Sequence, residues 1–298
     1  MSFINRSIEQ FSVPATIPQC LSHTRSYPQG IMEINYNELY LSAHRLFEAQ
    51  NYLECINVAQ SLANSPHLSF KSHGCLILGA CYFNLRLFDE SIRHSSLALQ
   101  YDPSLAGAYY NLANALKVMN RLEEARDCLR QGLIICPAFV GAHLLYANVL
   151  VYLGDFETAL EEYKSVVKLC PDMMIAYYNL SVLQLKLKRV TECAQTYGVI
   201  ADLLKAANET DKALNYYREA CKLKKEDWEV FYKYGVALKE ANKPNEALQV
   251  LKTALVLNNN SSLLHFQVGC VYETLGNDSR ALVHYQRAVS LDTLYTDR

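Results

Sequence analysis

The feature that most constrains this chain is a set of landmark residues that returns every 34 positions between Ser72 and Thr293, except for one shorter interval. Repeats of this length fold as one supersecondary unit each, and each unit buries its apolar face against its neighbours. Small residues at two places in every period let a pair of antiparallel helices approach closely. These small residues are Gly79, Ala113, Ala147, Gly235 and Gly269 in the first set, and Ser91, Ala125, Ala159, Ala213, Ala247 and Ala281 in the second.

Proline and turn residues mark where the helices of each period end. Pro103, Pro137 and Pro171 follow the second helix, because proline cannot continue it. The turn inside each pair requires a left-handed backbone, which favours glycine or asparagine, and its residues are Asn120, Gly154, Asn242 and Gly276. Period and landmarks together resemble the tetratricopeptide repeat (TPR) family. The predicted fold is all-α: a TPR α-solenoid, a right-handed superhelix of antiparallel helix pairs, with about seven repeats plus a half-repeat.

The period is broken in "VTECAQTYGVIADLLKAANETDKALNYYREACKL", where the second-helix landmark occurs at Cys193 and again, too early, at Ala213. One helix of a pair is missing. Ile200 followed by Ala201 suits a first helix, since a second helix asks for a small residue at Ile200. We therefore expect one helix near 190–207 to pack backward as a second helix and forward as a first, with a kink of the superhelix there. The alternative is an in-frame loss from splicing or a mispredicted exon.

These boundaries predict three parts. Residues 1–34 carry Pro14, Pro18 and Pro28 without sustained periodicity, which is typical of a disordered N-terminal arm. Residues 35–189 form TPR lobe 1 and residues 190–298 form TPR lobe 2. The last repeat lacks a polar capping helix, so we expect its end to be either a contact surface, for self-association or partner docking, or a truncation point.

Composition excludes several classes of function. The 28 basic and 30 acidic residues nearly balance, which argues against binding nucleic acid or an anionic membrane surface. The sequence has no apolar run of membrane-spanning length and no signal region, so we expect a cytoplasmic and/or nuclear protein. It contains no phosphate loop and no HExxH or GxSxG motif. The chain is therefore predicted not to be an enzyme and to need no cofactor.

The ten cysteines lie inside helical patterns without a CxxC pair, which indicates reduced core residues. His73 with Cys75 is the best case for a metal site. Two positions apart on a helix, however, they point to different faces. No metal is expected.

In such a solenoid the first helices line the concave groove, so their outward positions form the default binding surface. The surface is aromatic and amide-rich with little charge, which suits an extended peptide: amides pair with its backbone and rings cover its side chains. The alternative is that many of these rings only pack against neighbouring helices. The predicted partner-binding residues are Tyr110, Asn111, Asn114, Leu144, Leu145, Asn148, Tyr152, Tyr178, Asn179, Tyr232, Lys233 and Phe266.

One known peptide mode can be tested directly. TPR domains that hold acidic chaperone C-termini use a clamp of lysine, asparagine and arginine side chains. Tyr110 and Leu144 stand where that clamp has its first lysine, and Gln195 and Val199 stand at its last cations. Without cations the groove cannot pair a carboxylate, so this mode is rejected.

Within the TPR family, "AHRLFEAQNYLECI", "RLFDESIRHSSLALQYDPSLAGAYYNLANALK" and "LGDFETALEEYKSVVKLCPD" resemble the N-terminal repeats of protein O-GlcNAc transferase, over about residues 36–180. That family binds protein substrates through a ladder of asparagines, of which Asn111 and Asn179 keep the position. Its catalytic region is absent. Two hypotheses follow: a non-catalytic protein-interaction scaffold, or the TPR substrate-recognition part, fragment or divergent paralogue, of such a transferase.

Overall fold

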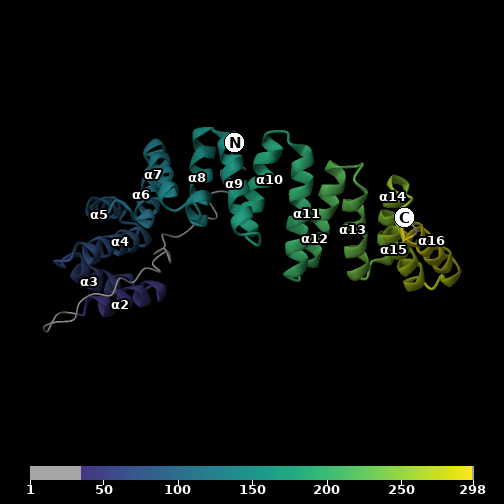
Figure 1. Cartoon of the computed structure of the whole chain (residues 1–298), viewed down its shortest axis with the longest axis horizontal. Helices are drawn as coiled ribbons and strands as arrows, with labels where there is room; N and C mark the ends of the chain where they lie inside the picture. Colours follow the sequence, from purple (N-terminus) through teal and green to yellow (C-terminus); the bar gives the residue numbers. More distant parts are fainter. Residues whose placement is uncertain (1–34, 297–298) are drawn as a thin grey trace. The chain divides into compact units, whose positions relative to one another are not determined.

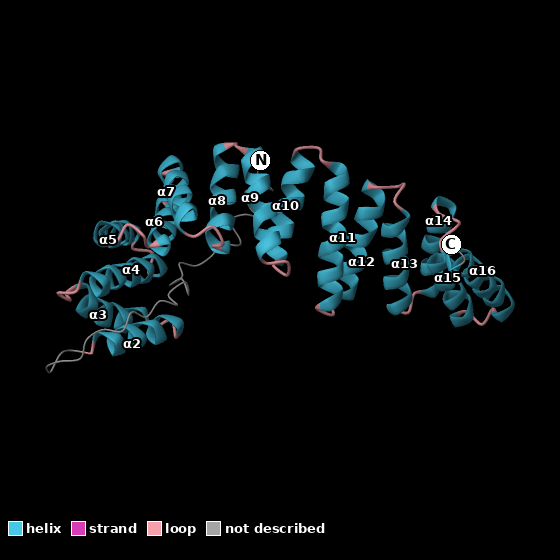
Figure 2. Cartoon of the chain, viewed as in Figure 1, coloured by secondary structure: helices cyan, strands magenta, loops and turns pink. Residues whose placement is uncertain are grey.

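The computed structural model describes residues 35–296, and side chains through residue 292. The described residues fold into helices joined by short turns, without a strand (Figure 2). They fall into two compact units, divided between residues 171 and 172: unit 1 is described from residue 35 to 171 and unit 2 from residue 172 to 296. The expected arm, residues 1–34, lies outside the described residues. The division of the rest into TPR lobe 1, residues 35–189, and TPR lobe 2, residues 190–298, stays a prediction. None of the described helices is both long and apolar enough to cross a membrane.

Unit 1 contains four helix pairs (Figure 1). In each pair the first helix packs against the second, and the second against the first helix of the next pair. The helices are α2 (Tyr36–Glu48), α3 (Tyr52–Ala63), α4 (Leu68–Asn84), α5 (Phe88–Tyr101), α6 (Ala106–Val118), α7 (Leu122–Ile135), α8 (Val140–Leu153) and α9 (Phe156–Leu169).

Unit 2 continues with an odd number of helices, because one helix belongs to two repeats (Figure 1). The helices are α10 (Met174–Lys186), α11 (Val190–Ala206), α12 (Thr210–Leu223), α13 (Trp228–Glu240), α14 (Pro244–Leu257), α15 (Ser262–Thr274) and α16 (Asp278–Thr296). With fifteen helices in the described residues, the expected seven repeats plus a half-repeat is confirmed.

The turns inside the pairs adopt the left-handed backbone that the sequence predicts. Asn120 has φ 60° and Gly154 has φ 85°. Gln50, Arg86 and Lys188 take the same conformation with φ of 59°, 62° and 56°. For these three the turn costs backbone strain of about 1 kcal/mol each, which the packing of the flanking helices offsets.

The small landmark residues lie where helices cross. Ala113 and Ala125 are fully buried between α6 and α7, and Ala147 and Ala159 between α8 and α9. Gly79 shows how close the approach is: a Cβ there would lie 3.3 Å from the backbone nitrogen of Ser95 in α5. The landmarks are therefore the contact points that set the spacing of the solenoid.

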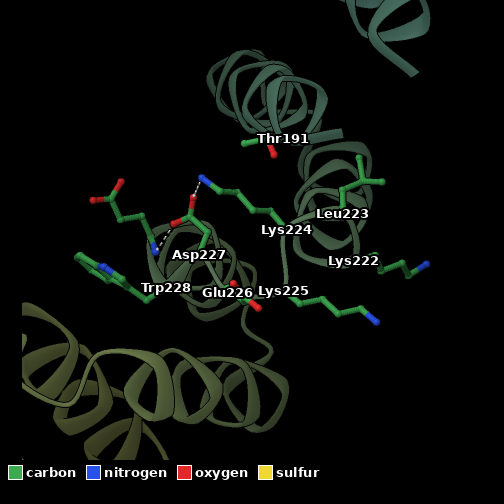
Figure 3. Close-up of a pocket in the computed structure, with 9 residues that line it drawn as sticks. Thr191, Lys222, Leu223, Lys224, Lys225, Glu226, Asp227 and Trp228 are labelled. Carbon is green, nitrogen blue, oxygen red and sulfur yellow. Dashed lines mark hydrogen bonds and ion pairs between the residues drawn. The ribbon is translucent and has the colours of Figure 1, made fainter. Parts of the chain in front are cut away.

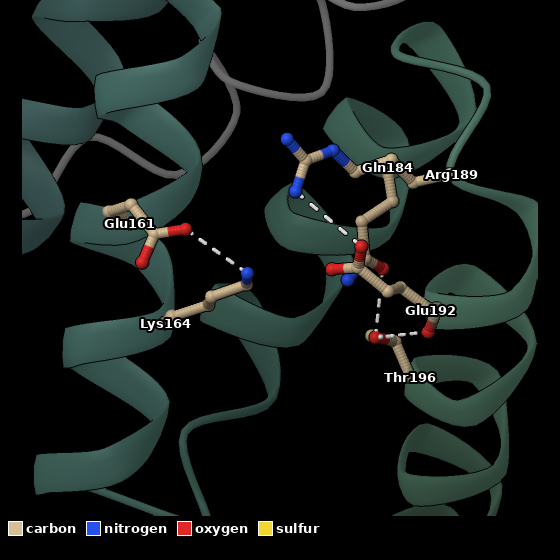
Figure 4. Close-up of polar contacts among 6 residues, drawn as sticks. All are labelled: Glu161, Lys164, Gln184, Arg189, Glu192 and Thr196. Carbon is tan, nitrogen blue, oxygen red and sulfur yellow. Dashed lines mark hydrogen bonds and ion pairs between the residues drawn. The ribbon is translucent and has the colours of Figure 1, made fainter.

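Helix α11 pairs backward with α10 as a second helix does. In α3 and α5, Cys55 Sγ and Ser91 Oγ donate to first-helix carbonyl oxygens twelve residues earlier. Cys193 Sγ makes the same contact with the carbonyl oxygen of Ser181, at 3.6 Å. One turn on, the Thr196 hydroxyl donates to Gln184 Oε1 at 2.8 Å (Figure 4). The first part of α11 thus has the register of a second helix.

Forward, α11 pairs with α12 as a first helix does. In unit 1 the Tyr163 hydroxyl of α9 donates to Asn148 Oδ1 of α8, fifteen residues earlier, at 2.6 Å. The Tyr217 hydroxyl of α12 donates to Asp202 of α11 at the same spacing. The prediction that one helix serves two repeats is confirmed. α11 is a continuous helix, and the expected kink of the superhelix stays a prediction.

Candidate functional site

The first helices form the inner edge of each unit. In unit 1, α2 contacts α4, α4 contacts α6, and α6 contacts α8; in unit 2, α13 contacts α15. Second helices of successive pairs in the described residues make no comparable contact. Stacked pairs that touch along one row of helices have that row on the inside of their curve. The predicted binding residues lie on α6, α8, α10, α13 and α15, all first helices.

In unit 1 the predicted aromatic and apolar residues are largely buried. Tyr110 and Leu145 belong to the core between α6, α7 and α8, and Leu144 is buried beside them. The Tyr110 ring packs on Phe139 with centroids 5.1 Å apart. Burial raises the pKa of Tyr110 to about 12. These side chains therefore pack between helices and stabilise the core of unit 1.

The amides of α6 differ from their neighbours. Asn111 is 0 % exposed, and neither its Oδ1 nor its Nδ2 has a hydrogen-bond partner. Asn114 is also buried, and its Nδ2 lacks a partner. A buried amide left unpaired costs about 1–3 kcal/mol. By contrast, Asn148 on α8 accepts from Tyr163. Asn111 thus presents a donor and an acceptor that the described helices do not use.

The inner face of unit 1 is uncharged apart from its ends. Helices α4, α6 and α8 contain no carboxylate and only two lysines, Lys71 and Lys117. The ammonium group of Lys117 lies 5.8 Å from the ring centroid of Tyr152, which is partly buried. Such a face suits a neutral ligand with backbone amides, not an acidic one.

In unit 2, Tyr178 belongs to an aromatic cluster on α10, α11 and α12. Its ring lies 5.8 Å from Tyr216, and Tyr197 meets Tyr216 edge-on at 5.3 Å. The Tyr178 hydroxyl also contacts Met174 Sδ at 3.0 Å. Asn179, the next residue, is buried. The structure thus gathers three tyrosines around the shared helix α11.

Farther along unit 2 the inner positions carry charge. Lys233 Nζ, on a side chain that is 49 % exposed, pairs with Asp202 Oδ2 at 2.7 Å. Lys239 Nζ donates to Gln267 Oε1 at 3.0 Å. Tyr232 is partly buried, whereas Phe266 is 49 % exposed and packs beside Tyr285. The expected low charge of the groove therefore describes unit 1 better than unit 2.

Sequence reasoning missed two residues of this region, Asp202 and Tyr216. Asp202 follows the small residue Ala201 as Asn148 follows Ala147, so aligning the first helices residue by residue would have found it. Tyr216 had no such signal, because it lies on a second helix. Whether any of the predicted residues binds a partner stays a prediction.

A cavity of about 780 Å³ in unit 2 lies at the loop between α12 and α13 (Figure 3). Lys224 Nζ pairs there with Asp227 Oδ2 at 2.7 Å, and the Asp227 carboxylate accepts from the Glu229 amide. Burial alone would raise the pKa of Asp227, but the hydrogen bonds from Lys224 and the Glu229 amide lower it. These contacts cap α13, so the cavity is explained by the turn that it borders.

Comparison with known families gives matches along most of the solenoid. Tetratricopeptide repeat models match residues 106–139, 199–262 and 264–293, and a TPR repeat model matches residues 147–188. Together they cover more than half of the chain. The match that starts at Val199 begins inside α11, where the first-helix register begins.

Curated relatives are distant. The BBSome complex member bbs-4 of Caenorhabditis elegans is 24 % identical over 80 % of this chain and 55 % of its own length. The human protein O-mannosyl-transferase TMTC3 is 24 % identical over 67 % of this chain and 21 % of its own length. The chain thus spans about half of the first relative and about a fifth of the second.

Solved structures include a tetratricopeptide repeat protein from Parabacteroides merdae, with a TM-score of 0.44 and 13 % identity over 86 % of this chain and 93 % of that one. MamA gives a TM-score of 0.36 and 15 % identity over 63 % of this chain and 98 % of that one. Repeat period, helix pairing and family matches agree: the chain belongs to the tetratricopeptide repeat family.

Proposed function

We propose that this chain is a non-catalytic scaffold whose first helices bind an extended, uncharged segment of a partner protein. The observation that carries the proposal is the fully buried, unpaired amide of Asn111 on the inner face of α6. A side-chain amide offers one acceptor and two donors, which match the N–H and C=O groups of an extended backbone. The apolar side chains around it would cover those of the ligand.

The relatives are consistent with a role in assembly. By its name, the worm relative is a member of a complex, the BBSome. The matched share of that protein is only about half, so its own partners are not carried over. What we take from it is the class of activity, protein binding by stacked repeats.

Affinity purification with mass spectrometry tests the proposal. The bait is the full chain, compared with Asn111→Ala and with Asn57→Ala as a matched control on the exposed face of α3. Because Asn111 makes no hydrogen bond within the described residues, its removal should leave folding intact, which circular dichroism checks. We expect Asn111→Ala to lose partners that wild type and Asn57→Ala retain. An unchanged partner set would refute binding through this face.

The transferase alternative remains a narrower proposal. It rests on the resemblance of residues 36–180 to the repeats of protein O-GlcNAc transferase and on Asn111 and Asn179 in that family's ladder. The human relative is, by its name, also a glycosyltransferase. Sugar-transfer activity that co-purifies with the chain, or downstream coding sequence for a catalytic region, would favour this alternative over a free-standing scaffold.

The last repeat supports a further proposal, self-association. Leu248 and Leu255 of α14 pack against the core, whereas Leu282 and Val289, one period later on α16, are 57 % and 63 % exposed. A second copy presents the same face, so an isologous contact would cover both. Analytical ultracentrifugation of wild type and Leu282→Glu tests this proposal. A wild-type protein that is monomeric at every concentration would refute it.

We also propose a cytoplasmic or nuclear location, which imaging of the tagged chain tests.

A further inference from the structure

A pocket of about 380 Å³ in unit 1 is lined by two turns between helix pairs and by α4. The turn from α5 to α6 supplies Asp102 and Leu105, and the turn from α7 to α8 supplies Phe139. No lysine or arginine is among the described residues that line it. Because pockets that hold small ligands begin at about 300 Å³, this one is large enough for the side chain of a partner.

Much of the wall of this pocket is apolar, and part of it is open to solvent. Leu76 of α4 and Leu105 are buried, whereas Ile135 at the end of α7 is 40 % exposed. The partly buried Phe139 is fixed by its contact with Tyr110, with ring centroids 5.1 Å apart. A wall of this kind suits an aliphatic chain, which would remove the exposed side chain of Ile135 from water.

Asp102 brings a partly exposed carboxylate to the pocket. Its Oδ1 accepts hydrogen bonds from the backbone N–H and the hydroxyl of Ser104, at 2.9 and 2.6 Å. Lys71 of the adjacent helix α4 does not pair with it, because its ammonium group lies over the ring of Tyr101, 4.8 Å from the centroid. Within the described residues, Asp102 Oδ2 is thus left without a cation or a hydrogen-bond donor.

The turn between α5 and α6 does not require the charge of Asp102. Asn258 has the same place between α14 and α15, and its neutral Oδ1 accepts from the backbone N–H two residues later, at 3.3 Å. The carboxylate of Asp227, in the turn before α13, pairs with Lys224 instead. Asp102 therefore carries a charge that is explained neither by its turn nor by a cation of the described chain.

His73 of α4 adds a second hydrogen-bond acceptor to the lining of the pocket. Its Nδ1 lies 2.6 Å from the carbonyl oxygen of Ser69, and because a carbonyl oxygen only accepts, Nδ1 carries the proton. In the neutral ring, Nε2 then holds a lone pair. The ring is partly buried and packs edge-on against Tyr40, with centroids 5.7 Å apart. The side chains of Asp102 and His73 therefore favour a ligand that donates hydrogen bonds and carries positive charge.

We propose that this pocket binds a lysine side chain of a partner protein, with its ammonium group on Asp102 and His73 and its aliphatic stem against Ile135 and Phe139. An ammonium group fits single acceptors, whereas a guanidinium prefers two parallel oxygens, and Asp102 Oδ1 already holds Ser104. This lysine flanks the uncharged segment that the inner face binds. The assignment to a partner protein rests on the proposed function, whereas the ammonium site itself does not.

Methyl NMR of the full chain tests the ammonium site without a partner. The probe is n-butylammonium, which is the lysine side chain alone, and 1-butanol is its neutral counterpart. We expect butylammonium to shift the methyl signals of Ile135 and Leu105 saturably in the millimolar range, and butanol to bind about threefold to fivefold more weakly, as for a partly exposed ion pair. Asp102→Asn keeps the turn, as Asn258 does, and should lower butylammonium affinity by the same factor.

Asp89→Asn, in the first turn of α5 and exposed, is the matched control and should bind butylammonium as wild type does. Equal affinities for butylammonium and butanol in wild type, or unchanged butylammonium affinity in Asp102→Asn, would overturn the site. Tighter binding of n-propylguanidinium than of butylammonium would overturn the assignment to lysine.

Partner capture tests whether the occupant is a lysine of a partner protein. Wild type, Asp102→Asn, Asp89→Asn and Asn111→Ala are used as baits, with untreated lysate and with lysate whose lysines have been acetylated. We expect Asp102→Asn and acetylation each to lower the yield of the same partners several-fold, and Asp89→Asn to retain them. Capture that ignores both Asp102 and acetylation would overturn the proposal.

The two proposals fail separately in this assay. If capture depends on Asn111 but not on Asp102, the lysine pocket fails and the proposed function stands. If capture depends on Asp102 and on free lysines but not on Asn111, the pocket stands and binding through the inner face fails.

Discussion

Replacing Tyr217 with phenylalanine tests whether the second part of α11 is a first helix. The Tyr217 hydroxyl is buried and donates to Asp202, which also pairs with Lys233 of α13. One side chain of α11 thereby links α12 and α13. The Tyr217→Phe change removes only this hydroxyl, because the ring keeps its place in the core of unit 2.

A hydrogen bond to a charged group contributes about 1.5–3 kcal/mol to stability. The Asp202 side chain is 42 % exposed, so water replaces part of the lost bond and we expect about 1.5 kcal/mol. Tyr163→Phe removes the equivalent bond to the neutral Asn148 in unit 1 and should cost about 1 kcal/mol. The two variants are thus matched in chemistry and differ in the repeat they affect.

Native-state hydrogen exchange measures the loss of stability in both variants. Repeat proteins open locally, so a single unfolding midpoint would not show which repeat is destabilised. About 1.5 kcal/mol corresponds to roughly tenfold faster exchange. For Tyr217→Phe we expect this change in peptides from α11 and α12, and for Tyr163→Phe a smaller change in α8 and α9. If Tyr217→Phe alters exchange in α11 less than twofold, the assignment of its first-helix register is wrong.

Three further changes address turns, packing and titration. Gly154→Ala should cost about 1 kcal/mol by differential scanning calorimetry, because φ is 85° and no atom lies within 4 Å of the new Cβ. Gly74→Ala should cost more, at least about 2 kcal/mol in the same assay, because its Cβ meets the α3 backbone 2.8 Å away. A hydrogen bond to Glu162 raises the pKa of His143, so this stabilisation is full below about pH 6.5 and is lost as pH rises through the raised pKa. Burial, then His265 and Lys252, lower the pKa of His284, so its repeat loses stability as pH falls below about 6.5. Exchange corrected for intrinsic rates should therefore show that acidification protects α8–α9 and weakens α15–α16; changes of the same sign in both would contradict this.

Much of the fold follows from local rules that one sequence displays. The left-handed turns at Asn120 and Gly154 follow from the few residue types that tolerate positive φ. The double role of α11 follows from landmarks counted in both directions from Cys193 and Ala213. Arg86 was not predictable as a turn residue, because there the tertiary packing outweighs the preference of its own backbone.

The candidate site was less predictable, because exposure depends on which helices approach one another. Tyr110 has the register of a groove residue, yet the ring of Phe139 covers it. Lys233 appeared as a lone cation, and its partner Asp202 lies on a helix thirty-one residues earlier. Neither contact has a signature within one repeat, since each joins side chains from different repeats.

The most direct test of the central claim, that the inner faces of the first helices bind a partner segment, is hydrogen exchange with and without the captured partner. The account predicts new protection in α4, α6 and α8, absent in Asn111→Ala, with α3, α5 and α7 unchanged. Protection confined to the second helices, or equal protection in wild type and Asn111→Ala, would contradict it.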